Sequence, residues 1–427
     1  MSQGIPPVRE LSSQQRRCNL LLWLYRTTLC TPFSTQQSEG LDQINGVDIT
    51  TLDGDLAQVR REIHKQHHLE IDARFHVQGK ALDQRLCLLQ ALRRGLRSSP
   101  AFIDDYFKPW LNQQLTQYST LASSCEKDRL TSLIERCESE LEQEFTPRDR
   151  LFLQLYIPWC LLQNAQGHYV TFTAQQQQWL HIKPEFRAAN ILYDQLQPAC
   201  GNPSRSEDRD FFILLLTLLQ QHRHDSSGSE LDQRLMHAVK HLIASFQDVS
   251  GMTFSSDEGL FRQLFAHLGP MIERCKFAIG IENQLQNEVE RMYPRLMRTT
   301  REALASFAAQ YQITLSEAEV GLIAVIFGAW LMQGNALQEK QILLLTDHNS
   351  ELEHAVEQQI REATLIPLNI KYQTLAAFHQ YGAPSGVAMI VTPYATKTTD
   401  ADPLVIHTQL PLAKDQRKRI RSLLEAR

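Results

Sequence analysis

The sequence predicts a mainly helical, multidomain protein that ends in a small α/β domain, and three observations lead to this fold class. The chain of 427 residues is longer than a typical single domain, which has roughly 100–200 residues. Apolar residues recur at three- and four-residue spacing through most of residues 16–332, the period of buried helix faces. After residue 337, short buried-type strands alternate with helical segments instead.

Composition excludes several classes of protein. The net charge of -5 provides no global attraction to nucleic acid or to acidic membranes. The first 17 residues carry no secretory signal, and the longest apolar runs, 211–219 and 321–332, fall short of the ~20 residues that span a bilayer. The eight cysteines are scattered without zinc-ligand spacing, which fits free thiols in a reducing compartment. We therefore expect a cytoplasmic protein with no membrane partner and no cofactor.

The N-terminal 82 residues predict three helices and a two-stranded ribbon. The helices are expected at 16–28, 34–44 (with Ser34 as N-cap) and 49–67, and the two short strands lie about Asp72 and end at Gly79. Asn45-Gly46 predicts a tight turn before the third helix. This is the layout of a winged helix-turn-helix over residues 1–82, whose third helix enters the major groove of DNA.

Charge weakens the DNA-binding interpretation of this domain. Its candidate contacts lie on the third helix: Thr50, Thr51, Arg60, Arg61 and Lys65. Residues 1–82 contain nine Lys or Arg and nine Asp or Glu, and we expect Asp53 and Asp55 at the exposed start of that helix to repel phosphates. A structural or dimerising module is the alternative.

Residues 83–227 are predicted to be helical throughout. Expected helices cover 83–97, 128–145 and 147–163, with Pro158 kinking or restarting the last one. The stretches 202–209 and 222–229 are the best loop candidates. Within the second, His222, His224 and Asp225 do not share a helical face, so we predict no metal site there. Whether this region holds a second, eroded copy of the next domain stays open, with residues 128–163 as its best remnant.

Residues 228–336 predict a compact bundle of about five helices that contains the most informative histidine. His267 lies beside an apolar stripe that includes Leu264 and Leu268, and Arg274 lies two turns further along the same side. Ser255 to Asp257 is expected to cap that helix. The closing helix, 315–332, is apolar nearly all round, which indicates a helix covered on all sides. Ser316 and Glu319 predict a capping box at its start.

These residues resemble the phosphotransferase-system regulation domain, the PRD, of bacterial antiterminators and transcriptional activators of sugar operons. The matching pieces are Leu264-x-x-His267-Leu268, Arg274, Tyr293-Pro294 and Glu319-x-Gly321-Leu322-Ile323-Ala324. The resemblance implies a bundle whose histidines are phosphorylated by the sugar phosphotransferase system, which resets a dimer interface. His267 matches the first family histidine, and Arg274 would hold either the phosphate or the bundle. Ile326 occupies the place of the second histidine and cannot accept a phosphoryl group.

Residues 337–427 predict a strand, a helix, three strands and a closing helix, a small α/β sheet with helical crossovers. This tail resembles the enzyme IIB-like domain that follows the PRD in activators of this family. That fold places a nucleophilic Cys after its first strand, whereas here Thr346 to Ser350 contains none and no Cys follows Cys275. His348 is the one candidate substitute, and we expect a docking domain that has lost its chemistry.

No phosphate-binding, dinucleotide-binding, nucleophile-elbow or zinc-protease motif occurs, so no enzyme is predicted. The first functional hypothesis is a PRD-type transcriptional regulator controlled by phosphorylation at His267 and by dimerisation. Its expected partners are DNA, a phosphocarrier protein of the phosphotransferase system, and a second copy of the chain bound through the PRD. The alternative is a degenerate regulator that binds no DNA and acts through protein contacts.

Overall fold

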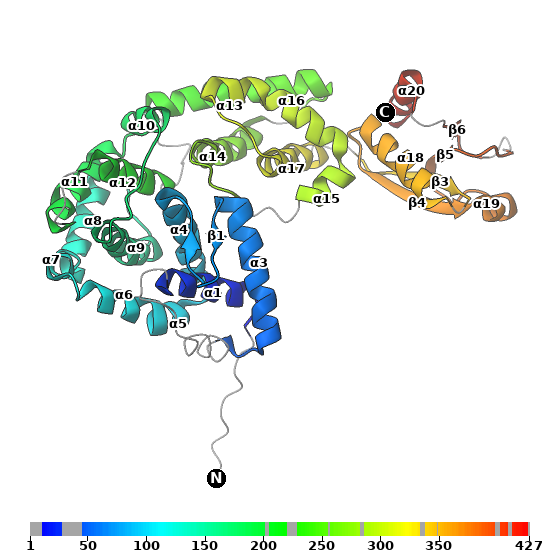
Figure 1. The fold of residues 1–427 in the computed structure, drawn as a ribbon. Coiled ribbons are helices and arrows are strands. Elements are labelled where there is room, and N and C mark those ends of the chain that lie inside the picture. Colours follow the sequence, from blue (N-terminus) through cyan, green and yellow to red (C-terminus); the bar gives the residue numbers. More distant parts are fainter. Residues whose placement is uncertain are drawn as a thin grey trace, which may run out of the picture. The chain divides into compact units, whose positions relative to one another are not determined.

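The computed structural model describes residues 11–27, 45–200, 205–219, 229–254, 257–281, 286–333, 338–347, 349–397, 402–408 and 412–425. The chain forms two compact units (Figure 1). The first comprises Met1–Gln221 together with Lys276–Gly280, and the second comprises His222–Cys275 with Ile281–Arg427. Within the described residues, no helix combines the length and the apolar character needed to cross a membrane.

The first unit opens with the elements that the sequence predicts. Helix α1 (Ser13–Thr27) and helix α3 (Ile49–His67) are followed by strands β1 (Glu70–Ile71) and β2 (Val77–Gln78), which pair antiparallel. The Asp48 side chain caps α3 by accepting a hydrogen bond from the Thr51 amide at 2.8 Å. The helix expected at 34–44 lies outside the described residues.

Helices fill the rest of the first unit, as predicted. They are α4 (Ala81–Ser98), α5 (Pro100–Phe102), the π-helix η2 (Ile103–Phe107), α6 (Lys108–Leu115), α7 (Ser119–Ser124), α8 (Lys127–Leu141), α9 (Pro147–Ala165), α10 (Ala174–His181), α11 (Phe186–Leu196), the 3₁₀-helix η3 (Gln197–Cys200) and α12 (Ser206–Leu219). Pro158 lies inside α9 and does not restart it. The loop predicted at 202–209 is too long, because α12 already begins at Ser206, where Glu207 and Asp208 place acids in its first turn. His222, His224 and Asp225 lie outside the described residues.

The second unit begins with the predicted helices. They are α13 (Glu230–Ser250), α14 (Asp257–Lys276, whose last residue belongs to the first unit), α15 (Gln286–Met292), α16 (Pro294–Tyr311) and α17 (Glu317–Gln333). The caps expected at Ser255 and Ser256 lie outside the described residues. Phe246 of α13 and Phe327 of α17 are fully buried and stack with ring centroids 4.0 Å apart. This stack fixes α17 in the bundle core.

The expectation that α17 is covered on all sides is only partly right. Val325 and Met332 are 39% and 46% exposed, and Leu322 and Ala329 on the same stripe are half-buried. These four residues, at spacings of three, four and three, form what we call the α17 stripe. The helix is apolar all round, but the part of the chain that the structure describes covers only part of its circumference.

The tail of the second unit is a parallel α/β sheet. Its elements are β3 (Lys340–Thr346), α18 (Ser350–Ala363), β4 (Leu368–Thr374), α19 (Leu375–Tyr381), β5 (Val387–Thr392), β6 (Val405–His407) and α20 (Lys414–Glu425). The described strands lie in the order β4-β3-β5-β6, and each neighbouring pair is parallel. Helix α19 is absent from the sequence prediction. It forms because the Thr374 side chain caps it, accepting from the Ala377 amide at 3.2 Å.

Candidate regulatory site and candidate DNA-binding helix

The structure brings His267, Arg274 and Glu319 together. Arg274 on α14 donates from Nε and Nη2 to the two carboxylate oxygens of Glu319 on α17, at 2.6 and 2.9 Å. The side chains are 18% and 4% exposed, so this bidentate ion pair is largely shielded from water. Arg274 therefore joins α14 to the first turn of α17, and of the two roles expected for it, the structure favours holding the bundle.

His267 is half-buried at the edge of this ion pair. Burial lowers the pKa of the His267 imidazole, the Arg274 guanidinium lowers it further, and the Glu319 carboxylate opposes both. The imidazole is consequently neutral near pH 7, and one of its ring nitrogens carries a lone pair. Such a nitrogen can act as a nucleophile toward phosphorus.

The start of α17 departs from the predicted capping box. The Ser316 hydroxyl accepts from the Glu319 amide at 3.3 Å, which is one half of the box. The Glu319 side chain, which the other half of the box would use, instead accepts from Arg274. Ile326, at the place of the second family histidine, is 3% exposed and belongs to the core.

A similar corner occurs in the first unit. Glu142 caps the end of α8 and Gln312 caps the end of α16, both with positive φ. Each cap is followed by a short loop and a hydroxyl side chain before the next helix. Asp149 in the first turn of α9 pairs with Arg93 of α4 at 3.3 Å, as Glu319 of α17 pairs with Arg274. Seven residues before Arg93, where α14 has His267, α4 has Leu86.

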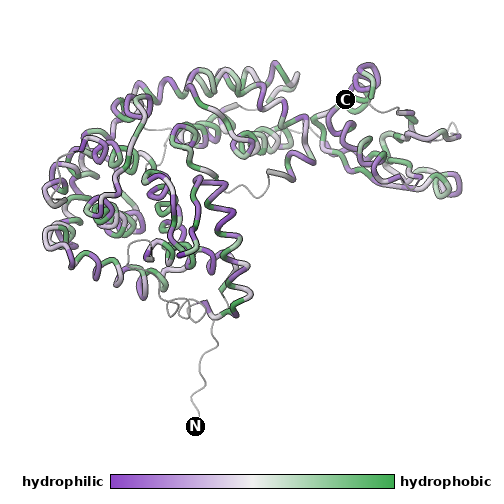
Figure 2. The backbone as a smooth tube through the Cα atoms, viewed as in Figure 1, coloured by the Kyte–Doolittle hydropathy of each residue, from purple (hydrophilic) through white to green (hydrophobic). Residues whose placement is uncertain are grey.

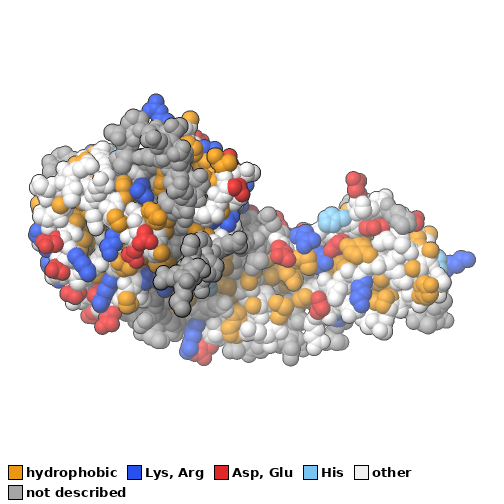
Figure 3. Space-filling model, turned by 90° about the horizontal axis from the view of Figure 1, so that it is seen from below, with side chains coloured by type: hydrophobic (Ala, Val, Ile, Leu, Met, Phe, Trp, Pro, Cys, Tyr) orange, Lys and Arg blue, Asp and Glu red, His pale blue; other side chains and the backbone are white. Residues whose placement is uncertain are grey.

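The candidate DNA contacts lie on α3, which Figure 2 shows as a mostly hydrophilic helix. Thr50, Arg60, Arg61 and Lys65 are exposed, and Thr51 is half-buried. His64 is exposed on the same face, and no pattern in the sequence singles it out. On the face of the molecule drawn in Figure 3, basic and acidic side chains are interspersed.

Asp55 corrects the expectation of an acidic start to α3. Its carboxylate is 10% exposed and accepts from Arg16 Nε at 2.8 Å, so it is an ion-paired contact between α1 and α3. Asp53 remains exposed. The exposed face of α3 thus carries Asp53 but not Asp55, one of the two acids expected there.

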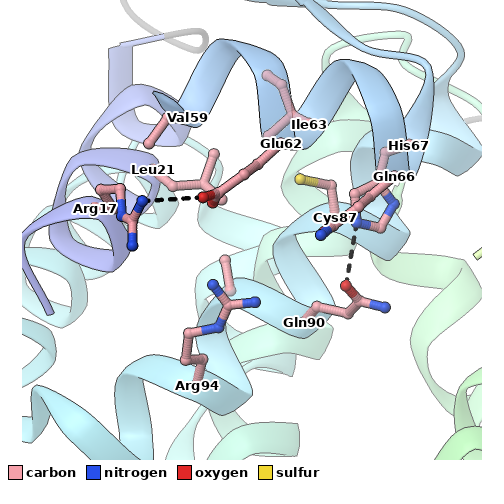
Figure 4. A pocket seen from close by; sticks show the side chains of 11 residues that line it. Arg17, Leu21, Val59, Glu62, Ile63, Gln66, His67, Cys87, Gln90 and Arg94 are labelled. Atoms are coloured by element: carbon pink, nitrogen blue, oxygen red, sulfur yellow. Dashed lines mark hydrogen bonds and ion pairs between the residues drawn. The ribbon is translucent and has the colours of Figure 1, made fainter. Parts of the chain in front are cut away.

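A small cavity lies between α1, α3 and α4 (Figure 4). Its volume is about 20 Å³, room for roughly one water molecule. Arg17 and Glu62 form an ion pair at 3.2 Å on its wall, and His67 Nε2 lies 3.2 Å from Gln90 Oε1. Burial lowers the pKa of His67 to about 4, which keeps this imidazole neutral. No sequence pattern pointed to this cluster.

The end of strand β3 carries no cysteine thiol, since no Cys follows Cys275 in the sequence. Asn349 caps α18 by accepting from the Leu352 amide at 3.1 Å. The Glu353 carboxylate accepts from the Asp347 amide at 3.0 Å and from the Tyr394 hydroxyl at 3.4 Å. The Glu353 carboxylate thus accepts hydrogen bonds from the donors nearest the carboxyl end of β3, Asp347 and Tyr394. His348 lies outside the described residues.

Comparisons with known proteins agree with these observations. Residues 240–330 match the PRD domain family, and residues 340–424 match the family described as stationary phase-inducible protein CsiE, C-terminal domain. The chain is 39% identical over 430 residues to stationary phase-inducible protein CsiE of Escherichia coli (strain K12), with 100% of both chains covered. It is 25% identical over 113 residues to transcriptional regulator ManR of Bacillus subtilis (strain 168), which covers 26% of this chain and 17% of that one. The expected PRD is confirmed.

Proposed function

The chain belongs to the CsiE family, and from this membership and its PRD we propose that it is a PRD-type transcriptional regulator switched by phosphorylation of His267. The observation that carries the proposal is the placement of a neutral, half-buried His267 beside the Arg274–Glu319 ion pair. The similarity to ManR, which is named a transcriptional regulator, supports the same class.

The geometry suggests how such a switch works. A phosphocarrier protein would transfer its phosphoryl group to a ring nitrogen of His267, which adds roughly -1.5 to -2 charges at the edge of the ion pair. That charge repels the Glu319 carboxylate and competes with it for Arg274. The ion pair that joins α14 to α17 is then weakened, and the packing of α17 changes with it.

Dimerisation through the PRD is the second part of the proposal. The α17 stripe of Leu322, Val325, Ala329 and Met332 has the three- and four-residue spacing of a helix–helix seam, and two of its members are more than a third exposed. Since Glu319 precedes this stripe on the same helix, a change at the Arg274–Glu319 pair would reach the seam within one turn.

For DNA we propose the N-terminal elements as a winged helix-turn-helix. Helix α3 and the β1–β2 hairpin supply the recognition helix and the wing of that layout. Arg60, Arg61 and Lys65 are exposed on α3, and the pairing of Asp55 with Arg16 removes one repulsive charge from that face.

The tail and the α8–α9 region have structural or docking roles in this proposal and no phosphoryl acceptor of their own. We propose that the tail is an IIB-like docking domain. The Glu353 carboxylate accepts the hydrogen bonds of the donors after β3, and no Cys follows Cys275. The α8–α9 corner with its Arg93–Asp149 pair favours an eroded PRD in the first unit, with Leu86 at the histidine place.

Labelling tests the switch directly. The full-length protein is incubated with phosphoenolpyruvate labelled in its phosphoryl group, the first phosphotransferase enzyme and the phosphocarrier protein. We expect label on the wild-type chain and on a His237→Ala control, whose histidine is an exposed residue of α13, and none on His267→Ala. Label that survives in His267→Ala contradicts the proposed acceptor.

Immunoprecipitation of chromatin from stationary-phase cells tests DNA binding. We expect discrete enriched sites for the wild type and their loss in Arg61→Ala/Lys65→Ala. The alternative is a degenerate regulator that acts through protein contacts, and the buried Ile326 and the carboxylate after β3 favour it. It becomes the better assignment if no site is enriched while the phosphocarrier or a second PRD protein co-purifies.

A further inference from the structure

Five residues of the first unit come from far along the chain. Helix α14, which carries His267, ends at Lys276, and Lys276–Gly280 belongs to the first unit, which otherwise ends at Gln221. We call these five residues the strap. Phe277 is 1% exposed and packs edge-on against Phe172, with centroids 6.2 Å apart. The side-chain amide of Gln176 donates to the Lys276 carbonyl at 2.9 Å. The strap is therefore anchored in the unit.

The other end of the strap is bonded to the C-terminal turn of α3. The Gly280 amide donates to the Gln66 carbonyl at 3.0 Å. Carbonyls of a last helical turn have no partner within the helix, so this bond satisfies a group that would otherwise need water. Gln90 of α4 donates to the Gly280 carbonyl at 3.2 Å and accepts from His67 on α3 at 3.2 Å (Figure 4). One glutamine thus joins α3, α4 and the strap.

Contact at Gly280 is too close for any side chain. A Cβ built on Gly280 would lie 2.6 Å from the Cα of Gln66 and 2.7 Å from its carbonyl oxygen. Because these are backbone atoms of a helix, they cannot move aside without displacing α3. The strap and α3 therefore meet backbone against backbone.

We propose that the strap is a positioning clamp on α3, and that it links the state of α14 to α3 through the continuous chain. This inference rests on the proposed function only for its biological meaning: α14 carries the proposed phosphoryl acceptor, and α3 carries the proposed DNA contacts. The clamp itself stands on the bonds of Gly280, Gln90 and His67 and on the burial of Phe277. A displacement of the end of α14 pulls on residues that hold α3 by its last turn.

Hydrogen–deuterium exchange of the full-length protein tests the clamp without DNA. Gly280→Ala forces the two backbones apart, and Gln90→Ala removes both side-chain bonds without adding an atom. We expect the amides of residues 64–68 to exchange roughly tenfold faster in each variant, the effect of losing one or two hydrogen bonds of ordinary net strength. Gly54→Ala is the matched control, since a Cβ at that α3 position meets nothing within 4 Å, and it should not speed exchange there. Unchanged exchange in the Gln90→Ala variant overturns the clamp, whether or not Gly280→Ala folds.

A second comparison tests the link. His267→Glu places a negative charge on α14, and we expect it to change exchange at residues 64–68 in the otherwise wild-type chain but not in Gln90→Ala. An equal change in both backgrounds, or no change in either, refutes transmission through the strap. Both exchange measurements are independent of DNA. If exchange at residues 64–68 responds as expected but no DNA site is found, the proposed DNA binding is wrong and the clamp still stands.

Discussion

Removing Arg274 should expose how much the bundle depends on one ion pair. In Arg274→Ala, the Glu319 carboxylate, which is 4% exposed in the wild type, loses both of its charge-assisted hydrogen bonds. Breaking a buried pair from one side costs about 3–5 kcal/mol, and because Arg274 is itself 18% exposed we expect about 3 kcal/mol. For a unit of this size that is a melting temperature lower by about 6–12 °C.

Calorimetry and urea unfolding of the full-length protein measure this loss. The control is Arg301→Ala, because Arg301 pairs with Glu317 between α16 and α17 with both side chains about 45% exposed, and such a pair contributes at most about 1 kcal/mol. Arg274→Met/Glu319→Leu, which removes both charges, should recover most of the loss. The reasoning is refuted if Arg274→Ala costs no more than Arg301→Ala. Histidine NMR of Arg274→Ala should also show a higher pKa for His267, since the lowering by the Arg274 charge is removed while burial and the Glu319 charge still act.

Three further predictions concern single residues. The pKa of His67 is lowered to about 4, so between about pH 6.5 and 4 the unfolded chain binds a proton that the folded chain does not, and stability falls as the pH falls through that window. Urea unfolding across the window should show a loss of stability up to about 3 kcal/mol larger for the wild type than for His67→Gln. Equal losses in the two proteins would contradict this prediction. Phe327→Ala should cost about 3–5 kcal/mol in the same assay, against less than about 1 kcal/mol for the exposed Val325→Ala, and similar costs would show that the stack is not central. Gln312→Gly relieves a positive φ of 52° and should stabilise the protein by up to about 1 kcal/mol, seen as a slightly higher melting temperature. Ala305→Gly, on the exposed face of α16, should lower the melting temperature.

Periodic patterns in the sequence were enough to locate most helices and the positions of the tail strands along the chain. Helix α3 has the bounds that the sequence predicts, because its apolar positions keep one period to Ile63; in the structure Asp48 caps its start. Helix α19 escaped notice because seven residues carry too few apolar repeats to define a face. Asp55 was misplaced even though the signal was present. It lies three residues after Leu52 and four before Val59, inside the apolar stripe, where an acid needs a partner.

Pairings between distant residues could not be predicted. His267 and Arg274 share a face at seven-residue spacing, so the sequence brings them together, but Glu319 lies 45 residues away from Arg274. The strap was missed for the same reason. Residues 276–280 have no periodicity, and only the packing of Phe277 against Phe172 and the bond from Gly280 to Gln66 give them a role.

The discontinuity of the first unit has a consequence for synthesis on the ribosome. An N-terminal domain normally folds while the chain behind it is still being made, at roughly 5–20 residues per second. Here Phe277 and Gly280 emerge several seconds after Gln221, so the nascent unit waits with the Phe277 site empty and the last turn of α3 without its Gly280 partner. The protein cannot clamp the helix that we propose to bind DNA before it has made the helix that carries the proposed phosphoryl acceptor. A translation product that stops early would therefore carry an α3 without its clamp.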